Sequence, residues 1–177
     1  FGYKIANSIS LDRWVKVFYG DLGIALTDTY TSAIFFRQFD KKLSKLFDGV
    51  RHDSGDPIEF AQMTIDHYQK MGINPLHKTI IFSDGLNPEK VENITKFCKN
   101  KIGISFGIGT NLTNDTGLRP MNIVMKLTGI SSYDIPWTGV VKLSDEGNKH
   151  TGNVRDIELA KEILQLGDIA SHDEYLQ

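Results

Sequence analysis

The sequence predicts an α/β fold built on a parallel β-sheet. Short apolar runs alternate with stretches whose apolar residues recur at steps of three and four, the pattern of amphipathic helices. Asp28, Asp53, Asp84 and Gly107 end successive apolar runs, and their steps of 25, 31 and 23 residues are typical of βα units. Helical crossovers between strands require parallel pairing. An α/β barrel and an open doubly wound sheet both satisfy this pattern.

The expected elements of the first half follow in order. A strand over 22–28 (LGIALTD) precedes a helical pattern over 35–46 that carries Phe35, Phe39, Leu43 and Leu46. The next strand ends in VRHDSGDP (50–57), and a second helical pattern covers 58–68. These alternations predict two consecutive βα units.

The second half repeats the alternation. KTIIFSDG (78–85) predicts a strand, and the helix after it places Val91, Ile94 and Cys98 on one stripe. KIGISFGIGT (101–110) predicts another strand with small residues at its end. Three further elements are expected: strands within 121–127 (MNIVMKL) and 137–143 (WTGVVKL), and an amphipathic helix through Val154, Ile157 and Leu164.

Composition and charge exclude several function classes. The chain has 177 residues, 40% of them hydrophobic, which suits a single domain. Its 20 basic and 22 acidic side chains give a net charge of −2, so no electrostatic argument favours nucleic acid or an anionic membrane as partner. No apolar run approaches the ~18–20 residues of a membrane span. The lone Cys98 excludes an intrachain disulfide and favours a buried thiol in a reducing, cytoplasmic location.

Two helix starts account for part of the polar sequence. In GDPIE, Asp56 suits the N-cap, Pro57 the first helical position and Glu59 the return partner of a capping box. Asn87 and Pro88 repeat the first half of this device. Asp53 and Asp84 are left without such a structural explanation.

Asp28, Asp53 and Asp84 are therefore the first functional candidates. Because the carboxyl ends of parallel strands meet at one edge, three acids at the same relative position are expected to converge there. Convergent carboxylates can bind Mg²⁺, accept hydrogen bonds from sugar hydroxyls or stabilise developing positive charge. Taken singly, each acid is more simply explained as a helix or turn cap.

Neighbouring residues add an anion-binding expectation. FGIGTN (106–111) can turn successive amides toward a phosphate, with Thr110 adding a hydroxyl. The loop lacks the ending of a P-loop and the full dinucleotide fingerprint. Arg51 can pair with the nearby acids or bind a substrate carboxylate or phosphate. His52 alternates to the opposite face of the strand and is expected to be structural.

Four ordered motifs carry a family resemblance. LGIALTDTYT, VRHDSGDP, IFSDGLNP and SFGIGTNLTND together resemble the nicotinate phosphoribosyltransferase family, from Phe1 to at least Leu143. The resemblance implies ATP-coupled transfer of phosphoribosyl from phosphoribosyl pyrophosphate (PRPP) to nicotinate, which yields nicotinate mononucleotide and pyrophosphate in NAD salvage. It also implies an irregular α/β barrel of the type II phosphoribosyltransferase kind, an additional N-terminal domain and homodimers.

The resemblance assigns roles by motif. Asp53 and Asp84 become catalytic candidates that face the ribose and its Mg²⁺-pyrophosphate, and Arg51 contacts nicotinate or the PRPP phosphates. The 5-phosphate is cradled by Gly107, Gly109 and Thr110. Asp28 lies near the pyridine ring, and Thr29 and Ser54 are further substrate-binding candidates.

One departure from the family pattern sets expectations for the chain as a whole. The family's phosphorylatable histidine, in a PHEW-like motif, is missing, and the first residue is Phe1. Residues 1–177 are therefore expected to be the C-terminal part of the barrel domain, inactive alone and with normally covered apolar edges exposed. Alternatives are a nicotinamide- or quinolinate-type phosphoribosyltransferase, a non-catalytic PRPP-binding module and, more distantly, a Mg²⁺-dependent hydrolase.

Overall fold

The computed structural model describes residues 2–121 and 123–167, and its centre is a four-stranded parallel sheet. The strands are β1 (Ile24–Leu26), β2 (Gly49–His52), β3 (Thr79–Phe82) and β4 (Gly103–Phe106). They lie side by side in the order of the sequence, and each pairs with the next in parallel. The predicted α/β class with a parallel sheet is confirmed.

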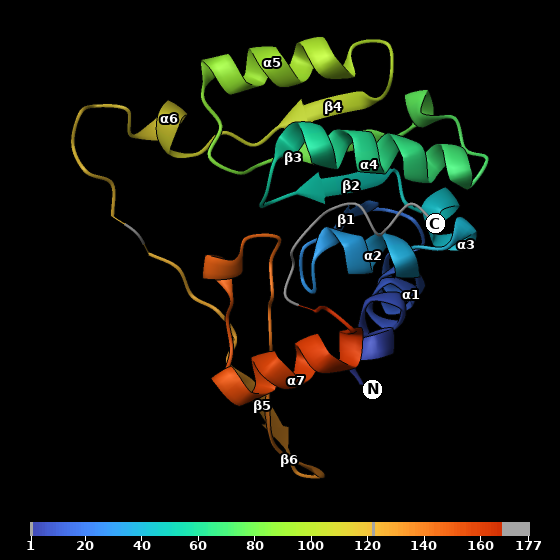
Figure 1. Ribbon diagram of the computed structural model, residues 1–177, viewed down its shortest axis with the longest axis vertical. Coiled ribbons are helices and arrows are strands. Elements are labelled where there is room, and N and C mark those ends of the chain that lie inside the picture. Colours follow the sequence, from blue (N-terminus) through green and yellow to red (C-terminus); the bar gives the residue numbers. More distant parts are fainter. Residues whose placement is uncertain (1, 122, 168–177) are drawn as a thin grey trace.

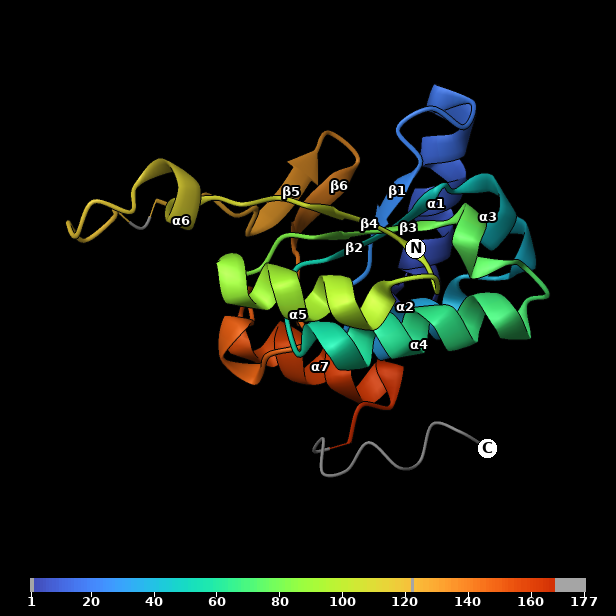
Figure 2. The same ribbon diagram turned by 90° about the horizontal axis from the view of Figure 1, so that it is seen from above.

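Helices connect consecutive strands. Helices α2 (Ser32–Gln38) and α3 (Lys41–Leu46) join β1 to β2, α4 (Pro57–Lys70) leads to β3 through a short 3₁₀ turn (Pro75–His77), and α5 (Pro88–Cys98) leads to β4. Helices α4 and α5 lie next to each other along one face of the sheet (Figures 1 and 2). These crossovers bring the carboxyl ends of the strands to one edge.

The single helical pattern expected over 35–46 is in fact two helices. Asp40 caps α3 by accepting a hydrogen bond from the Leu43 amide at 2.8 Å. A capping residue has extended rather than helical backbone, so the chain turns there and starts a new helix.

Both predicted helix starts are confirmed. Asp56 Oδ1 accepts hydrogen bonds from the amides of Ile58 and Glu59, at 2.8 and 2.9 Å, and Pro57 opens α4. Asn87 and Pro88 start α5 in the same manner. Gly55 has a φ of +84°, which a residue with a side chain rarely adopts, so the turn before α4 favours glycine.

The main hydrophobic core lies between the sheet and the helices. Its fully buried side chains include Phe39, Tyr68, Ile80 and Phe82, and Cys98 is buried there as predicted. Leu11 and Val15 of helix α1 (Ala6–Phe18) pack against it; this helix, which a 3₁₀ turn (Tyr3–Ile5) precedes, was not among the expected elements.

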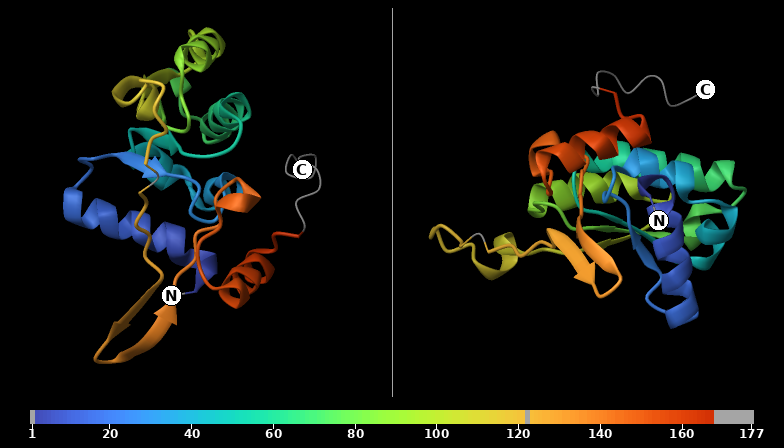
Figure 3. Two further views of the ribbon diagram at one scale, coloured as in Figure 1. Left: turned by 90° about the vertical axis from the view of Figure 1, so that its left-hand side faces the viewer. Right: turned by 90° about the horizontal axis from the view of Figure 1, so that it is seen from below.

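The segment after β4 departs from the sequence expectation. The short helix α6 (Thr110–Thr113) leads into residues 123–128, which form no strand, so the strand expected over 121–127 is wrong in its described part. The next two strands, β5 (Gly129–Ser132) and β6 (Ile135–Gly139), form an antiparallel hairpin that projects from the body (Figures 1 and 3). In the region where a strand was expected over 137–143, the observed strand β6 ends at Gly139 and pairs antiparallel with β5.

The expected strand is absent because its described residues have no neighbouring strand to pair with. Met121, Ile123, Met125 and Leu127 alternate as in a strand, yet their side chains are 65–96% exposed. A strand forms only where a neighbour shares its backbone hydrogen bonds, and in the described part of the chain no strand pairs with residues 123–127. The apolar side chains of this segment are exposed, and their coverage in a longer protein stays a prediction.

The chain then returns across the sheet edge. Residues 141–149, here called the crossing segment, precede helix α7 (Val154–Leu164), which confirms the expected C-terminal helix. Val141 and Leu143 pack with Ala160 and Leu164 of α7 in a second, smaller core. No helix in the described ranges is both long and apolar enough to cross a bilayer.

Candidate active site

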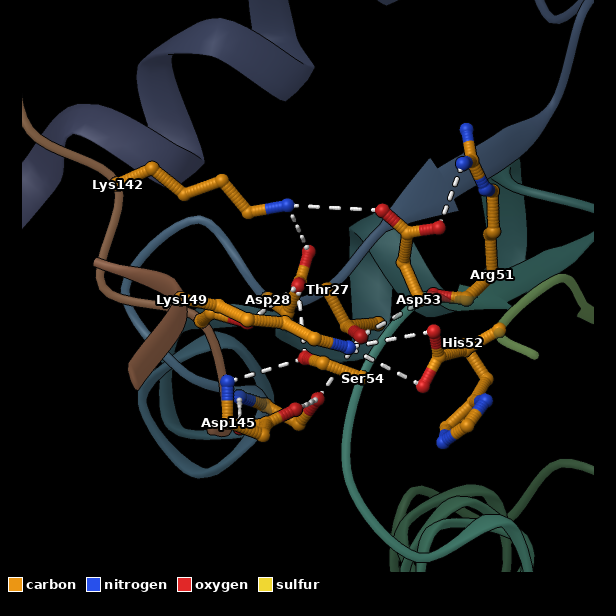
Figure 4. Close-up of polar contacts among 12 residues, drawn as sticks. Thr27, Asp28, Arg51, His52, Asp53, Ser54, Lys142, Asp145 and Lys149 are labelled. Carbon is orange, nitrogen blue, oxygen red and sulfur yellow. Dashed lines mark hydrogen bonds and ion pairs between the residues drawn. The ribbon is translucent and has the colours of Figure 1, made fainter. Parts of the chain in front are cut away.

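The carboxyl ends of β1, β2 and β3 bring the predicted acids to one edge of the sheet, and the crossing segment runs over that edge (Figure 4). Backbone hydrogen bonds fasten the segment there: the Leu143 amide donates to Thr29 O at 2.7 Å and the Ser144 amide donates to Asp28 O at 3.0 Å. The site therefore consists of strand ends plus a segment that begins 113 residues after Asp28, which lies at the first of these strand ends.

Asp28 is fully buried and held by protein groups on both oxygens. Its Oδ2 accepts hydrogen bonds from Ser54 Oγ at 2.8 Å and Ser144 Oγ at 3.2 Å, while its Oδ1 lies 3.1 Å from Lys142 Nζ. Ser54 Oγ also accepts from the Asp145 amide at 3.0 Å. The polar atoms of Asp28 and Ser54 are thus turned toward the protein.

Arg51, Asp53 and Ser83 form a more open cluster. Arg51 Nη2 donates to Asp53 Oδ1 at 2.7 Å, Arg51 Nε donates to Ser83 Oγ at 2.9 Å, and Ser83 Oγ lies 3.0 Å from Asp53 Oδ1. The Arg51 side chain is 45% exposed, so a ligand can still reach it. Partial burial works to raise the pKa of Asp53, but the Arg51 and Ser83 hydrogen bonds and the Lys142 charge lower it overall.

Asp84 is paired with a second lysine of the crossing segment. Lys149 Nζ lies 3.2 and 3.3 Å from the two Asp84 oxygens and 3.0 Å from Glu146 Oε1. Partial burial lowers the pKa of Lys149, but its hydrogen bonds to Glu146 and Asp84 raise it overall. Glu146 Oε1 also accepts from the Gly55 amide at 3.2 Å, which fixes the turn before α4.

Asp145 anchors the crossing segment from the other side. Its carboxylate accepts from the Ser32 amide at 2.7 Å and from Ser32 Oγ at 2.6 Å. Burial raises the pKa of Asp145, and neighbouring Asp28 adds to this, although the Ser32 hydrogen bonds oppose it. Thr31 presents Ser32 from a φ of +86°, an unfavourable backbone for a β-branched residue.

The predicted glycine loop follows β4. The Gly107 amide donates to Phe82 O at 2.8 Å, and a Cβ on Gly107 would lie 3.3 Å from the Ser83 Cβ, so this residue touches the Arg51 cluster. Gly109 is the N-cap residue before α6, with open space where a side chain would be, and Thr110 is the first residue of that helix. Thr29 is half-buried beneath the crossing segment.

His52 faces away from this site, as predicted. Its imidazole is buried against the rings of Phe60 and Phe82, at centroid distances of 5.0 and 5.6 Å. Nε2 lies 3.1 Å from Gly55 O, and burial lowers the pKa of the ring despite this contact. Its surroundings are those of a core residue.

The acids do not form a metal centre by themselves. Within the described ranges, no three His, Cys, Asp or Glu side chains are grouped closely enough to hold a metal ion. Asp53 and Asp84 instead face Lys142 and Lys149. Two carboxylates remain suitable for Mg²⁺ that also binds substrate phosphates, because Mg²⁺ commonly uses one or two carboxylates in that way.

Sequence reasoning missed Ser83, Lys142, Asp145 and Lys149. Two of them carried a signal: Ser83 directly precedes Asp84, and Asp145 follows the expected strand over 137–143, so the rule that selected the other acids also selects it. The two lysines carried none, because their role depends on where the crossing segment lies.

Comparisons with known proteins point to one family over almost the whole chain. The sequence model of the nicotinate phosphoribosyltransferase (NAPRTase) family matches residues 2–168. The chain is 61% identical to a nicotinate phosphoribosyltransferase of Chromohalobacter salexigens and 49% identical to one of Methanosarcina acetivorans. These alignments cover 94% and 92% of this chain but only 43% and 40% of the relatives.

Solved structures agree. The fold is similar to a crystal structure of nicotinate phosphoribosyltransferase from Porphyromonas gingivalis, with a TM-score of 0.89 and 47% identity, over 93% of this chain and 43% of that one. The nicotinate phosphoribosyltransferase structure from Vibrio cholerae has a TM-score of 0.85 and 34% identity, over 93% and 40% of the two chains. The chain therefore spans less than half the length of these relatives.

Proposed function

This chain belongs to the nicotinate phosphoribosyltransferase family, and from that premise we propose that the whole protein transfers phosphoribosyl from PRPP to nicotinate with coupled ATP hydrolysis. The observation that carries the proposal is the Arg51–Asp53–Ser83 cluster at the carboxyl ends of parallel strands. An accessible guanidinium beside an ionised carboxylate suits a reaction in which an anionic acceptor attacks a sugar that becomes positively charged.

Arg51 is the proposed anion contact. Nicotinate carries a carboxylate and PRPP carries phosphates, and the planar guanidinium binds both groups well. Because Arg51 donates through Nη2 and Nε to Asp53 and Ser83, its remaining N–H groups are oriented by the protein before a substrate arrives. This orientation reduces the entropy lost when the substrate binds.

Asp53 and Asp84 are the proposed catalytic residues. Displacement at C1 of the ribose passes through a state with positive charge on the sugar, which nearby carboxylates stabilise. The lowered pKa of Asp53 supports this role, because the group is then ionised at neutral pH. Gly107, Gly109 and Thr110 are proposed to hold the 5-phosphate through backbone amides and a hydroxyl. Thr29 remains a candidate substrate contact. The buried Ser54 hydroxyl is instead bonded to Asp28 and the Asp145 amide, so we propose for Ser54 a role through these two residues.

Mg²⁺ is proposed to enter with PRPP. Bound to the pyrophosphate, the ion would stabilise the charge of the leaving group. Asp53 and Asp84 are the carboxylates suited to it, with Lys142 staying beside Asp53 and Lys149 displaced from Asp84. ATP is proposed as co-substrate on the strength of family membership.

The remaining proposals concern the whole protein. We propose that residues 1–177 correspond to the C-terminal part of the barrel domain, and that the whole protein is a cytoplasmic homodimer. The chain alone is expected to be inactive, because relatives more than twice its length share the match. Turnover by the isolated 177 residues would contradict this expectation.

The test is a substrate panel on the whole protein. Nicotinate, nicotinamide and quinolinate are each supplied with PRPP, Mg²⁺ and ATP, and mononucleotide and pyrophosphate are quantified. We expect turnover with nicotinate, a strong loss in Arg51→Gln, and little change in the matched control Arg155→Gln, an exposed residue of α7. Selective use of another pyridine, or PRPP binding without product, would refute the proposal.

A further inference from the structure

We propose that Lys142 is a positioning residue for this reaction: it holds the second oxygen of Asp53 in place and balances the buried charge of Asp28. The inference rests on the proposed function, because it assigns the lysine a role through a proposed catalytic residue. Lys142 lies outside every motif on which the site was predicted, and only the crossing segment brings it to the strand ends.

The position of Lys142 is set by its backbone rather than by the site. Its amide donates to Thr151 O at 2.9 Å, and its carbonyl accepts from the Thr151 amide at 2.8 Å. The neighbours Val141 and Leu143 are buried in the second core. The ammonium therefore projects toward the acids from a rigid anchor (Figure 4).

The lysine completes the contacts of Asp53. Oδ1 of this carboxylate is held by Arg51 and Ser83, whereas Oδ2 faces Lys142 Nζ at 3.6 Å. Three groups, one in β2, one directly after β3 and one in the crossing segment, thus fix the orientation of one carboxylate. Without the ammonium, Oδ2 can rotate about the Oδ1 contacts, and a group placed 1 Å from its productive position loses catalytic efficiency.

Charge gives a second reason for a lysine here. Asp28 is fully buried, with Lys142 Nζ 3.1 Å from its Oδ1 and with hydroxyl groups on its Oδ2. A buried carboxylate without a compensating cation is strongly unfavourable. Acidic side chains outnumber basic ones among the described residues at this edge. Besides Asp28, the acidic ones are Asp53, Asp84, Asp145 and Glu146, and the basic ones are Arg51, Lys142 and Lys149. Removing one of these cations would leave neighbouring carboxylates with less compensating positive charge.

These contacts define how Lys142 acts. Its ammonium already lies between two carboxylates, so its effect on the reaction passes through them. Loss of the charge should therefore reduce kcat through Asp53, and the KM for PRPP should change less. A purely structural lysine would change thermal stability and leave both kinetic constants of the folded protein intact.

The experiment is a double-mutant comparison on the whole protein. Lys142→Met removes the charge at similar length, Lys142→Arg keeps it, and Lys96→Gln on the exposed face of α5 is the control. Asp28→Asn removes the buried charge, so Asp28→Asn/Lys142→Met folds without an uncompensated carboxylate. For each protein, kcat, KM for PRPP and the thermal midpoint are measured.

We expect Lys142→Met to lower kcat by about 10–100-fold, by analogy with the loss seen when a partner that orients a metal ligand is removed, and Lys142→Arg to recover most of it. The double variant should fall below Asp28→Asn by a similar factor. Equal kcat values for those two proteins would overturn the inference, because Lys142 would then act only by compensating Asp28. Unchanged kcat in Lys142→Met would overturn it as well.

A structural readout separates this inference from the proposed function. If the wild-type whole protein makes no nicotinate mononucleotide, the function fails, and crystal structures of wild type and Lys142→Met then decide the role of the lysine. Rotation of Asp53 Oδ2 away from its wild-type position supports the inference. An unmoved Asp53 contradicts it.

Discussion

Acidification should destabilise this protein through His67, a buried imidazole of α4. Its ring packs against those of Phe36 and Phe39, at centroid distances of 4.9 and 5.8 Å, and its Nε2 lies 2.9 Å from Ser44 Oγ. Burial lowers the pKa of His67 to about 4. The folded state therefore excludes a proton that the unfolded chain binds near the ordinary histidine value of about 6.5.

Proton linkage gives the direction in which the free energy of unfolding changes with pH. Because the unfolded state binds the proton more tightly, the free energy of unfolding falls as the pH drops below about 6.5, and the loss is complete near pH 4. With these two values, His67 accounts for a loss of about 2 kcal/mol between pH 8 and pH 5. Burial also lowers the pKa of His52, which adds to the same trend.

The assay is urea unfolding at pH 8 and pH 5. The variant Ser44→Ala/His67→Phe replaces both polar partners by apolar groups and cannot bind the proton, so its loss of stability should be smaller than that of wild type by about 2 kcal/mol. The control His77→Phe alters an exposed ring and should keep the wild-type difference. Equal pH dependence in wild type and the double variant would refute the reasoning.

Three further outcomes follow from the packing. Asp56→Ala should lower the free energy of unfolding by about 1 kcal/mol, because two amides of α4 lose their acceptor; an unchanged urea midpoint would contradict the cap. Phe39→Ala should lower the free energy of unfolding by about 3–5 kcal/mol, since the ring is fully buried against Phe35. A loss below 1 kcal/mol would show that the surrounding core relaxes to fill the cavity. Met125→Lys should reduce self-association of the isolated chain, measured by light scattering, because this apolar residue is 96% exposed. Unaltered association would show that another surface is responsible.

Local patterns determined much of the fold. The steps of the apolar residues indicated the alternation of strands and helices from β1 to α5, without the break between α2 and α3, and the pairs Asp56–Pro57 and Asn87–Pro88 set where two helices begin. These properties depend on neighbours within a few residues, so they can be inferred from the sequence. The alternation along a strand also placed Arg51 at the site and His52 in the core.

The same reasoning failed where structure depends on a distant partner. The alternation in 121–127 is that of a strand, but a strand needs a neighbour, and the described chain supplies none there. The sequence by itself determined that Asp28, Asp53 and Asp84 meet at one sheet edge. Only the tertiary structure decided that Asp28 is buried and that Lys142 and Lys149 face these acids. Electrostatic contacts depend on distance in space, and the backbone that brings the lysines to this edge is held by residues far away in the sequence.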